Sequence, residues 1–258
     1  MKIAIIGGDR RFDLLAERLA ARHDVLRDPA AEQLGDADAV VTQNPVRGGH
    51  TNRAEILANA PADAHLILHG SGRQGIPADR VCTDLLEIEE FVEQNAVLTA
   101  EGAISAAMQA TQGALTGSMC LVVGYGRIGR ALAGMLQGLG AQIMVAARRP
   151  DVRLQAKADG AEIFDTGEST LAGAVALADY VFSTPPAQLL TEKVLANVRQ
   201  GVPVIDLASP PYGVDAEAAQ RLGVKAWRES GVPGRYCPAA AAGLMETAIE
   251  RLLAGPVG

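Results

Sequence analysis

One segment of this 258-residue chain, Gly124-Tyr125-Gly126-Arg127-Ile128-Gly129, restricts the possible folds more than any other. The apolar run Leu121–Val123 precedes it like a buried strand, and Gly140 stands where a helix often ends. Apolar residues recur between them at helical spacing: Ile128, Leu132, Met135 and Leu139. In such a strand–turn–helix unit the first glycine permits a tight turn, the second leaves space for a pyrophosphate, and the third lets the helix pack against the strand. The segment therefore predicts a dinucleotide-binding α/β domain; an ordinary turn without a ligand is the alternative.

The rest of the chain alternates between short apolar strands and helical patterns, which is typical of α/β domains with parallel sheets. The expected strands are Ile3–Ile6, Val25–Leu26, Ala39–Val41, Leu66–Leu68, Cys120–Val123, Ile143–Ala146, Glu162–Phe164, Tyr180–Ser183, Val204–Leu207 and Val224–Ala226. The pattern predicts two domains, a doubly wound Rossmann domain and a smaller flavodoxin-like α/β domain at the N-terminus.

The helical stretches set the expected domain boundaries. Residues 1–94 form the N-terminal domain on the substrate side, 95–112 a bridging helix, 113–230 the Rossmann domain, and 231–258 a loop and helix that pack back on the N-terminal domain. We expect Asn95–Thr99 to break the helical stretch from Leu85 to Gln112 into two helices. The substrate is expected in the cleft that two such domains make.

Composition and charge exclude several classes of protein. The net charge of -7 argues against nucleic acid or an anionic membrane as the main partner. Cys82, Cys120 and Cys237 are far apart, so we expect neither a metal site nor a disulfide framework. No stretch reaches the roughly 20 apolar residues of a membrane span, and the N-terminal apolar run is too short for a signal peptide. A soluble, cytoplasmic protein is expected.

Residues at the carboxyl ends of the expected strands indicate which dinucleotide would bind. The strand after the glycine turn ends in Arg148 and Arg149, where NAD enzymes usually carry an acidic residue for the ribose hydroxyls. A guanidinium group binds phosphate oxygens as a fork, so the two arginines favour NADP, with NAD as the alternative. Simple solvation of one or both arginines is the other interpretation. The later strand ends predict four further cofactor contacts: Thr184, Pro185, Leu207 and Ala208.

The histidines do not follow the pattern of the commonest two-domain dehydrogenases. A 2-hydroxy-acid dehydrogenase usually has a catalytic histidine after its glycine turn. Here all four histidines precede the turn: His23, His50, His65 and His69. This argues against that class, unless a side chain of the first domain reaches the substrate.

Several short segments occur together in one order over nearly the whole chain. They are Ile6–Arg10, Asn95–Ile104, Val123–Gly129, Ala147-Arg148, Asp206–Ser209 and Gly231–Gly234. In these segments the chain resembles the dehydrogenase component, or A subunit, of dipicolinate synthase from the dipicolinate pathway of bacterial sporulation, in a shortened and divergent form. The segments around Thr99–Gly102 and Gly231–Gly234 are more specific than the glycine turn.

The resemblance implies NADP-dependent oxidation of a dihydrodipicolinate-type cyclic dicarboxylate, together with a flavoprotein-like B subunit. Catalytic roles are then expected for Thr99, Glu101 and Ser209; for Glu101, a helix-capping or junction hydrogen bond is the alternative. An anionic substrate needs cationic partners, and the residues expected to bind it are Arg10, Asn95 and Arg235. Proteins of this shape often form homodimers, which is our expectation here.

The chain departs from the family pattern in two places. Little chain lies between Val46 and Leu66, and Ala239–Ala242 stand where the family tends to carry a lysine and a threonine. Two other functions therefore stay open. The chain is either another NAD(P)-dependent oxo-, hydroxy- or imino-acid dehydrogenase, or a dinucleotide-binding regulatory protein without chemistry of its own.

Overall fold

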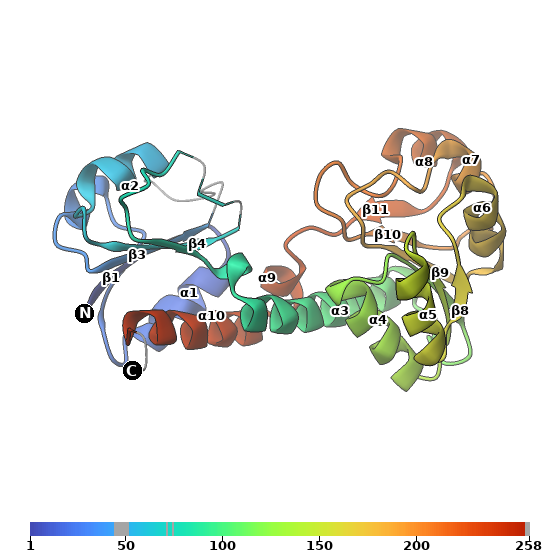
Figure 1. Ribbon diagram of the computed structural model, residues 1–258, viewed down its shortest axis with the longest axis horizontal. Coiled ribbons are helices and arrows are strands. Elements are labelled where there is room, and N and C mark those ends of the chain that lie inside the picture. Colours follow the sequence, from blue (N-terminus) through green and yellow to red (C-terminus); the bar gives the residue numbers. More distant parts are fainter. Residues whose placement is uncertain (44–51, 71, 74, 256–258) are drawn as a thin grey trace. The chain divides into compact units, whose positions relative to one another are not determined.

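Residues 1–43, 52–70, 72–73 and 75–255 are described by a computed structural model, and they form two α/β units (Figure 1). Unit 1 comprises Met1–Asn95 and Pro233–Gly258, and unit 2 comprises Ala96–Val232. Part of the short segment between Val46 and Leu66 lies outside the described residues. Helix α3, Glu89–Thr111, belongs to both units. The four-part division expected from the sequence therefore stays a prediction in its detail.

Unit 1 contains a parallel five-stranded sheet in the order β2-β1-β3-β4-β5. Its strands are β1 (Lys2–Ile6), β2 (Asp24–Arg27), β3 (Ala39–Gln43), β4 (His65–His69) and β5 (Cys82–Asp84). This order is the flavodoxin-like one and confirms the predicted class. Strand β5 is absent from the sequence prediction, because three residues carry no measurable alternation.

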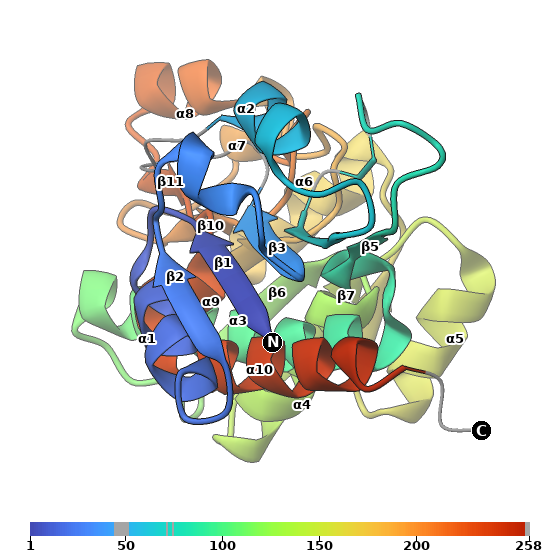
Figure 2. The ribbon, with the colours of Figure 1, turned by 90° about the vertical axis from the view of Figure 1, so that its left-hand side faces the viewer.

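Alternating residues of these strands enter two different apolar layers. Ile3 and Ile5 of β1 face a cluster that contains Phe12 of α1 (Arg10–Leu19) and Met245 of α10 (Pro238–Leu253). Their neighbours along the strand, such as Ile6, face a cluster on the other side of the sheet that includes α2 (Arg53–Asn59). Figure 2 shows α1 and α10 on the same side of the sheet. The last helix of the chain thus completes the core of the first domain.

Unit 2 contains a parallel six-stranded sheet in the order β11-β10-β9-β6-β7-β8, which confirms the predicted Rossmann topology. Its strands are β6 (Met119–Val123), β7 (Gln142–Ala146), β8 (Glu162–Phe164), β9 (Tyr180–Ser183), β10 (Val204–Asp206) and β11 (Ala226–Arg228). Its helices after α3 are α4 (Arg127–Gly138), α5 (Pro150–Ala158), α6 (Glu168–Leu177), α7 (Glu192–Leu195) and α8 (Ala216–Leu222). All strands are parallel, so their carboxyl ends meet at one edge.

The last strand begins later than the sequence predicts. The apolar run from Val224 to Ala226 suggested a strand, but β11 starts at Ala226. Gly223 ends α8 in the left-handed region, and the backbone N–H of Val224 bonds back to the carbonyl of Ala219. This is the hydrogen bond of a glycine-terminated helix end, so Val224 belongs to the helix cap.

Two helices also differ from the prediction. Helix α3 runs without a break through Asn95–Thr99, since that stretch contains neither glycine nor proline and the weak helix formers cost only tenths of a kcal/mol each. Burial of Ala96, Thr99 and Ala100 outweighs that cost. The expected loop after Gly231 contains the short helix α9, Val232–Tyr236.

Within the described part of the chain, no helix has the length and apolarity needed to cross a membrane.

Candidate functional site

Two of the three glycines in the turn between β6 and α4 occupy positions where a side chain would clash, and the third leaves the start of α4 open. Gly124 has a φ of +88°, and a Cβ there would lie 2.4 Å from Oγ1 of Thr184. A Cβ on Gly129 would lie 2.2 Å from the carbonyl oxygen of Gly124. Gly126 faces open space and caps α4 without a side-chain oxygen. The helix start is therefore accessible to an anionic group.

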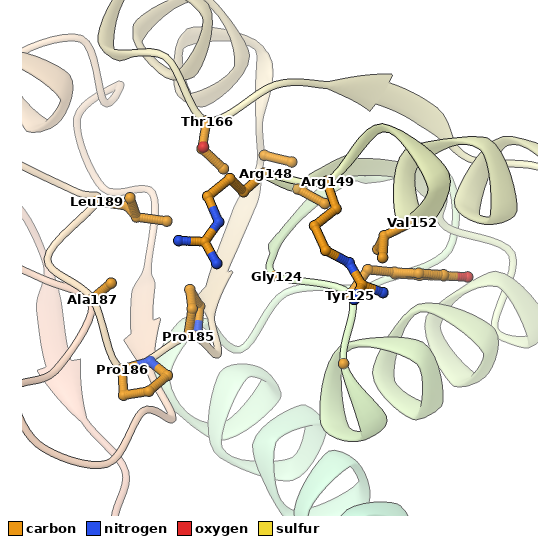
Figure 3. A pocket seen from close by; sticks show the side chains of 13 residues that line it. Gly124, Tyr125, Arg148, Arg149, Val152, Thr166, Pro185, Pro186, Ala187 and Leu189 are labelled. Atoms are coloured by element: carbon orange, nitrogen blue, oxygen red, sulfur yellow. The ribbon is translucent and has the colours of Figure 1, made fainter.

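A pocket of about 480 Å³ opens beside this turn (Figure 3). Its wall is formed by residues from the ends of β6, β7 and β9 and the loops that follow them, from the first turn of α5 and from the segment after β8. They are Gly124, Tyr125, Gly126, Ala146, Ala147, Arg148, Arg149, Val152, Thr166, Pro185, Pro186, Ala187 and Leu189. Six residues that the sequence predicts as cofactor contacts are in this set: Gly124, Tyr125, Gly126, Arg148, Arg149 and Pro185. These residues, predicted from three separate motifs, therefore lie together.

The pocket is positively charged. The side chain of Arg148 points into it between Thr166 and Pro185, while Arg149 extends toward the side where Tyr125 lies (Figure 3). Both arginines are exposed at the start of α5, and Arg149 forms a 3.2 Å ion pair with the exposed Asp151. None of the described residues that line the pocket is acidic. The wall therefore offers guanidinium groups to a phosphate.

Tyr125 forms part of the pocket wall and is itself fixed from behind. Its ring is buried, and its hydroxyl donates a 2.8 Å hydrogen bond to Oδ2 of Asp159, which follows α5. Burial, and then this hydrogen bond, raise the pKa of Tyr125 to about 12, so the hydroxyl stays a donor at neutral pH. This bond ties the glycine turn to the far end of the helix that begins beside Arg148 and Arg149.

The other predicted cofactor residues lie outside the lining of the pocket. Arg127 is exposed, Ile128 is half-buried and Gly129 is buried under the turn. Thr184 donates through Oγ1 to the carbonyl of Val123, which holds the ends of β9 and β6 together. Leu207 and Ala208 are buried after β10, and the next residue, Ser209, is exposed.

The loop from Leu207 to Val214 is held by a buried carboxylate. Asp206, which is 2 % exposed, accepts hydrogen bonds from the backbone N–H groups of Ala208, Gly213 and Val214. A Cβ on Gly213 would lie 2.0 Å from Oγ of the buried Ser183, so only glycine fits there. The geometry of this loop is thus set by the strand ends beneath it.

The residues predicted to bind or convert substrate are spread over several elements. Arg10 is exposed at the start of α1, Arg235 is exposed on α9, and Asn95 is half-buried on α3. Thr99 is buried and Glu101 is exposed on the same helix. Two positions further along a helix, a side chain has turned by about 200° around the axis, so these two side chains leave α3 in nearly opposite directions. Their roles stay predictions.

The carboxyl edge of the sheet in unit 1 carries a polar cluster around the buried Arg11, which sequence reasoning missed. The guanidinium of Arg11 forms two hydrogen bonds with Asp9, of 2.6 Å and 2.9 Å, and approaches Nε2 of His69 to 3.4 Å. Burial favours the neutral form of Asp9, but the hydrogen bonds and charge of Arg11 prevail and lower its pKa. Burial, and then the charge of Arg11, lower the pKa of His69 to about 4.

The same cluster explains why a glycine stands at position 234, in one of the segments that carry the resemblance. A Cβ on Gly234 would lie 2.6 Å from Nε of Arg11, so the backbone of the Gly231–Gly234 segment passes directly over this arginine. Gly7, in the N-terminal segment, has equally little space, because a Cβ there would lie 2.4 Å from the ring of Phe12. Only the spacing of Asp9 and Arg11 indicates the cluster in the sequence, and the close approach of Arg11 to Gly234 has no signal there.

Metal ligands do not gather in the described structure: within it, no three His, Cys, Asp or Glu side chains form a group that could hold an ion. The candidate site described above consists of three parts: the glycine turn, the arginine-lined pocket and the loop anchored by Asp206.

Comparison with known sequence families gives one match for the middle of the chain. Residues 81–212 match the family described as D-isomer specific 2-hydroxyacid dehydrogenase, NAD binding domain. This region contains the glycine turn, the arginine-lined pocket and most of the Asp206 loop. The match goes against the argument from the histidines, which counts against the 2-hydroxy-acid dehydrogenase class.

Individual relatives extend the likeness beyond that region. The A subunit of dipicolinate synthase from Bacillus subtilis is 32% identical over 177 residues, which are 69% of this chain and 59% of that protein. The crystal structure of the corresponding protein from Bacillus halodurans superposes with a TM-score of 0.86 at 26% identity and covers 98% of both chains. The crystal structure of the Bacillus subtilis protein has a TM-score of 0.83 at 24% identity, covering 98% of this chain and 96% of that one. The resemblance inferred from the short segments is confirmed.

Proposed function

The chain belongs to the D-isomer-specific 2-hydroxyacid dehydrogenase family through its NAD-binding domain, and on this premise we propose that it is an NADP-dependent dehydrogenase of the same type as the A subunit of dipicolinate synthase. Its substrate is a dihydrodipicolinate-type cyclic dicarboxylate, which it oxidises. One observation carries the cofactor assignment: the pocket beside the glycine turn has two arginines and no acidic residue among the described residues that line it.

The residues of the pocket fit a phosphorylated dinucleotide. Gly126 leaves room for a pyrophosphate in front of α4. Arg148 follows the second strand of the nucleotide-binding half and its side chain points into the pocket, which supports binding of a 2′-phosphate by its guanidinium fork. An acidic residue at that place would repel the phosphate and bind the free hydroxyls of NAD instead.

The chemistry divides between cofactor and protein. NADP, when bound, supplies the hydride acceptor. The chain holds the ring against it, excludes water and removes the proton that the oxidation releases. Thr99, Glu101 and Ser209 are our candidates for these roles, with the exposed carboxylate of Glu101 as the proton acceptor. Arg10, Asn95 and Arg235 are candidates for binding the carboxylates.

The cofactor assignment is tested by Arg148→Asp. We expect NADP to bind about 10- to 100-fold more weakly, because a charged hydrogen-bonded pair contributes about 1.5–3 kcal/mol, while NAD affinity changes little. The matched control is Lys157→Asp, which makes the same charge change on the exposed surface of α5 away from the pocket. Dissociation constants come from titration of the purified variants. Equal losses for NADP and NAD would overturn the assignment.

The substrate assignment is tested by mixing the protein with NADP and dihydrodipicolinate and following NADPH absorbance. Formation of NADPH supports the proposed reaction. We propose that a flavoprotein-like B subunit is the partner, and the assay is repeated with it. Size-exclusion chromatography of each protein and of the mixture tests both this complex and the proposed homo-oligomer.

A second candidate is a regulatory protein that binds NADP and performs no chemistry. It is favoured by the position of the histidines, all of which precede unit 2, and by the run Ala239–Ala242 at the start of α10. NADP binding without turnover, even with the flavoprotein-like partner present, would decide for this candidate.

A further inference from the structure

The carboxyl edge of the sheet in unit 2 continues beyond the dinucleotide pocket to β11. In register along this edge lie Val123 of β6, Ser183 of β9, Asp206 of β10 and Arg228 of β11. Neighbouring strands are about 4.8 Å apart, so Arg228 lies three strands, or about 14 Å, from the strand that leads into the glycine turn. Figure 1 shows β9, β10 and β11 side by side in unit 2.

The side chain of Arg228 is held in one orientation by an aromatic ring. Its guanidinium carbon lies over the ring of Tyr212, 3.2 Å from the ring centroid, which is a cation–π contact. Arg228 is exposed, and its side chain forms no hydrogen bond or ion pair with any residue that the structure describes. Its N–H donors are therefore available to a ligand while its rotation is restricted.

The backbone of Tyr212, which carries this ring, is held in place by the loop around it. Its φ is +71°, a conformation that costs a residue other than glycine free energy unless the surroundings enforce it. The surroundings do so: the N–H of Tyr212 bonds to the carbonyl of Ser209, and the next two residues donate to the buried Asp206. A strained residue that holds a cation with free donors indicates a binding role.

We propose that Arg228, held over the ring of Tyr212, binds a carboxylate of the substrate. This inference rests on the proposed function, because it places the substrate beside the nicotinamide. In a doubly wound domain the two halves of the dinucleotide lie on opposite sides of the central strand, so a nucleotide with its adenosine half at β7 has its nicotinamide half at β9 and β10. The next position along the edge is β11. A carboxylate next to the ring that is oxidised then meets the fork of Arg228.

The test measures binding of dipicolinate to the protein saturated with NADPH, by calorimetry, and the KM for dihydrodipicolinate. Arg228→Gln is expected to weaken dipicolinate binding about 10- to 100-fold and to raise the KM by a similar factor, as loss of a charged hydrogen-bonded pair does. The dissociation constant for NADPH should stay within about twofold of the wild-type value, since Arg228 lies outside the arginine-lined pocket. Arg228→Lys keeps the charge without the fork and should lose less.

Two further variants separate binding from folding. Tyr212→Gly removes the ring and relieves the strained backbone, so it should weaken dipicolinate binding without lowering the melting temperature. Arg221→Gln, an exposed arginine on α8 that pairs with Glu192, is the matched control and should bind dipicolinate like the wild type.

The outcomes for the inference and for the proposed function are distinct. A wild-type protein that binds NADPH but neither dipicolinate nor dihydrodipicolinate overturns the proposed substrate, and the inference with it. A wild-type protein that binds dipicolinate, with Arg228→Gln equal to it, overturns only the inference. Parallel losses of NADPH and dipicolinate affinity in Arg228→Gln also overturn it, since they would mark a structural residue.

Discussion

Arg11 shows how unit 1 accommodates a charge away from water. A buried guanidinium is costly unless its N–H groups are bonded and its charge is balanced. Asp9 balances the charge and accepts two hydrogen bonds from the guanidinium of Arg11. Nη1 of the same guanidinium lies 3.4 Å from Nε2 of neutral His69, which can only accept from it. The rings of Phe12 and Phe91 are T-shaped to the ring of His69, with centroids 6.4 Å and 5.8 Å away. The cluster thereby fixes the turn that leads into α1.

The depressed pKa of His69 makes the stability of unit 1 depend on pH. In the folded protein this histidine has a pKa of about 4, whereas in the unfolded chain its pKa is near the ordinary value of 6.5. The contribution of neutral His69 to the free energy of unfolding is therefore complete above pH 6.5. It is lost as the pH falls to about 4, an effect on the order of 3 kcal/mol. Urea unfolding at several pH values should show this fall in the wild type.

His69→Gln should make that fall shallower. It should not abolish it, because burial also lowers the pKa of His65. A variant whose unfolding free energy falls as steeply as that of the wild type between pH 6.5 and 4 would contradict the assignment.

The glycine turn allows a matched comparison on one helix. Gly129→Ala places a Cβ against the carbonyl of Gly124, so we expect a loss of about 1–3 kcal/mol of stability and much weaker NADP binding. Gly134→Ala, further along α4, meets nothing within 4 Å and should gain up to about 1 kcal/mol. Urea unfolding and NADP titration measure both; similar behaviour of the two variants would refute the steric argument.

At the scale of elements, the contact between α1 and α10 holds unit 1 together. Met245 of α10 is fully buried in the cluster that contains Phe12 of α1. Beside it, Glu246, whose side chain is 15 % exposed, accepts hydrogen bonds from Arg18 and Arg22 of α1, and both arginines are about half exposed. The apolar contact should dominate, because exposed ion pairs contribute about 0–1 kcal/mol.

Substitution of the two neighbours tests this ranking. Met245→Ala should lower the free energy of unfolding by about 2–5 kcal/mol, since it leaves a cavity. Glu246→Ala should cost about 1 kcal/mol or less, and its effect should shrink in high salt. Denaturant unfolding measures both values, and a larger loss for Glu246→Ala would reverse our interpretation.

At the scale of the whole molecule, the two units differ in continuity. Unit 2 is one continuous segment, whereas unit 1 needs both ends of the chain. A fragment of residues 89–232, which includes all of α3, should therefore fold and bind NADP. Residues 1–95 alone should not fold, because α1 would expose the apolar face that α10 covers, and adding 233–258 as a separate peptide should restore its helical signal. Circular dichroism follows each fragment; independent folding of 1–95 would contradict the role of α10.

The sequence by itself determined the class of both units and the place of the glycine turn. Those features depend on local periodicity and on glycines whose neighbours in the chain identify them. It also placed Arg148 and Arg149 at a strand end beside the turn. Local patterns failed at element boundaries such as Asn95–Thr99 and Val224, where side-chain burial and a helix cap decided the outcome.

Only the tertiary structure decided which distant residues meet. Arg11 lies beneath Gly234, and Arg228 lies over the ring of Tyr212, in a loop that the buried Asp206 holds. None of these pairs has a signal in the sequence, because each depends on the order of strands in a sheet and on the path of a loop across its edge. Periodicity records which face of an element is buried, whereas the partner on that face is set by the packing of the whole chain.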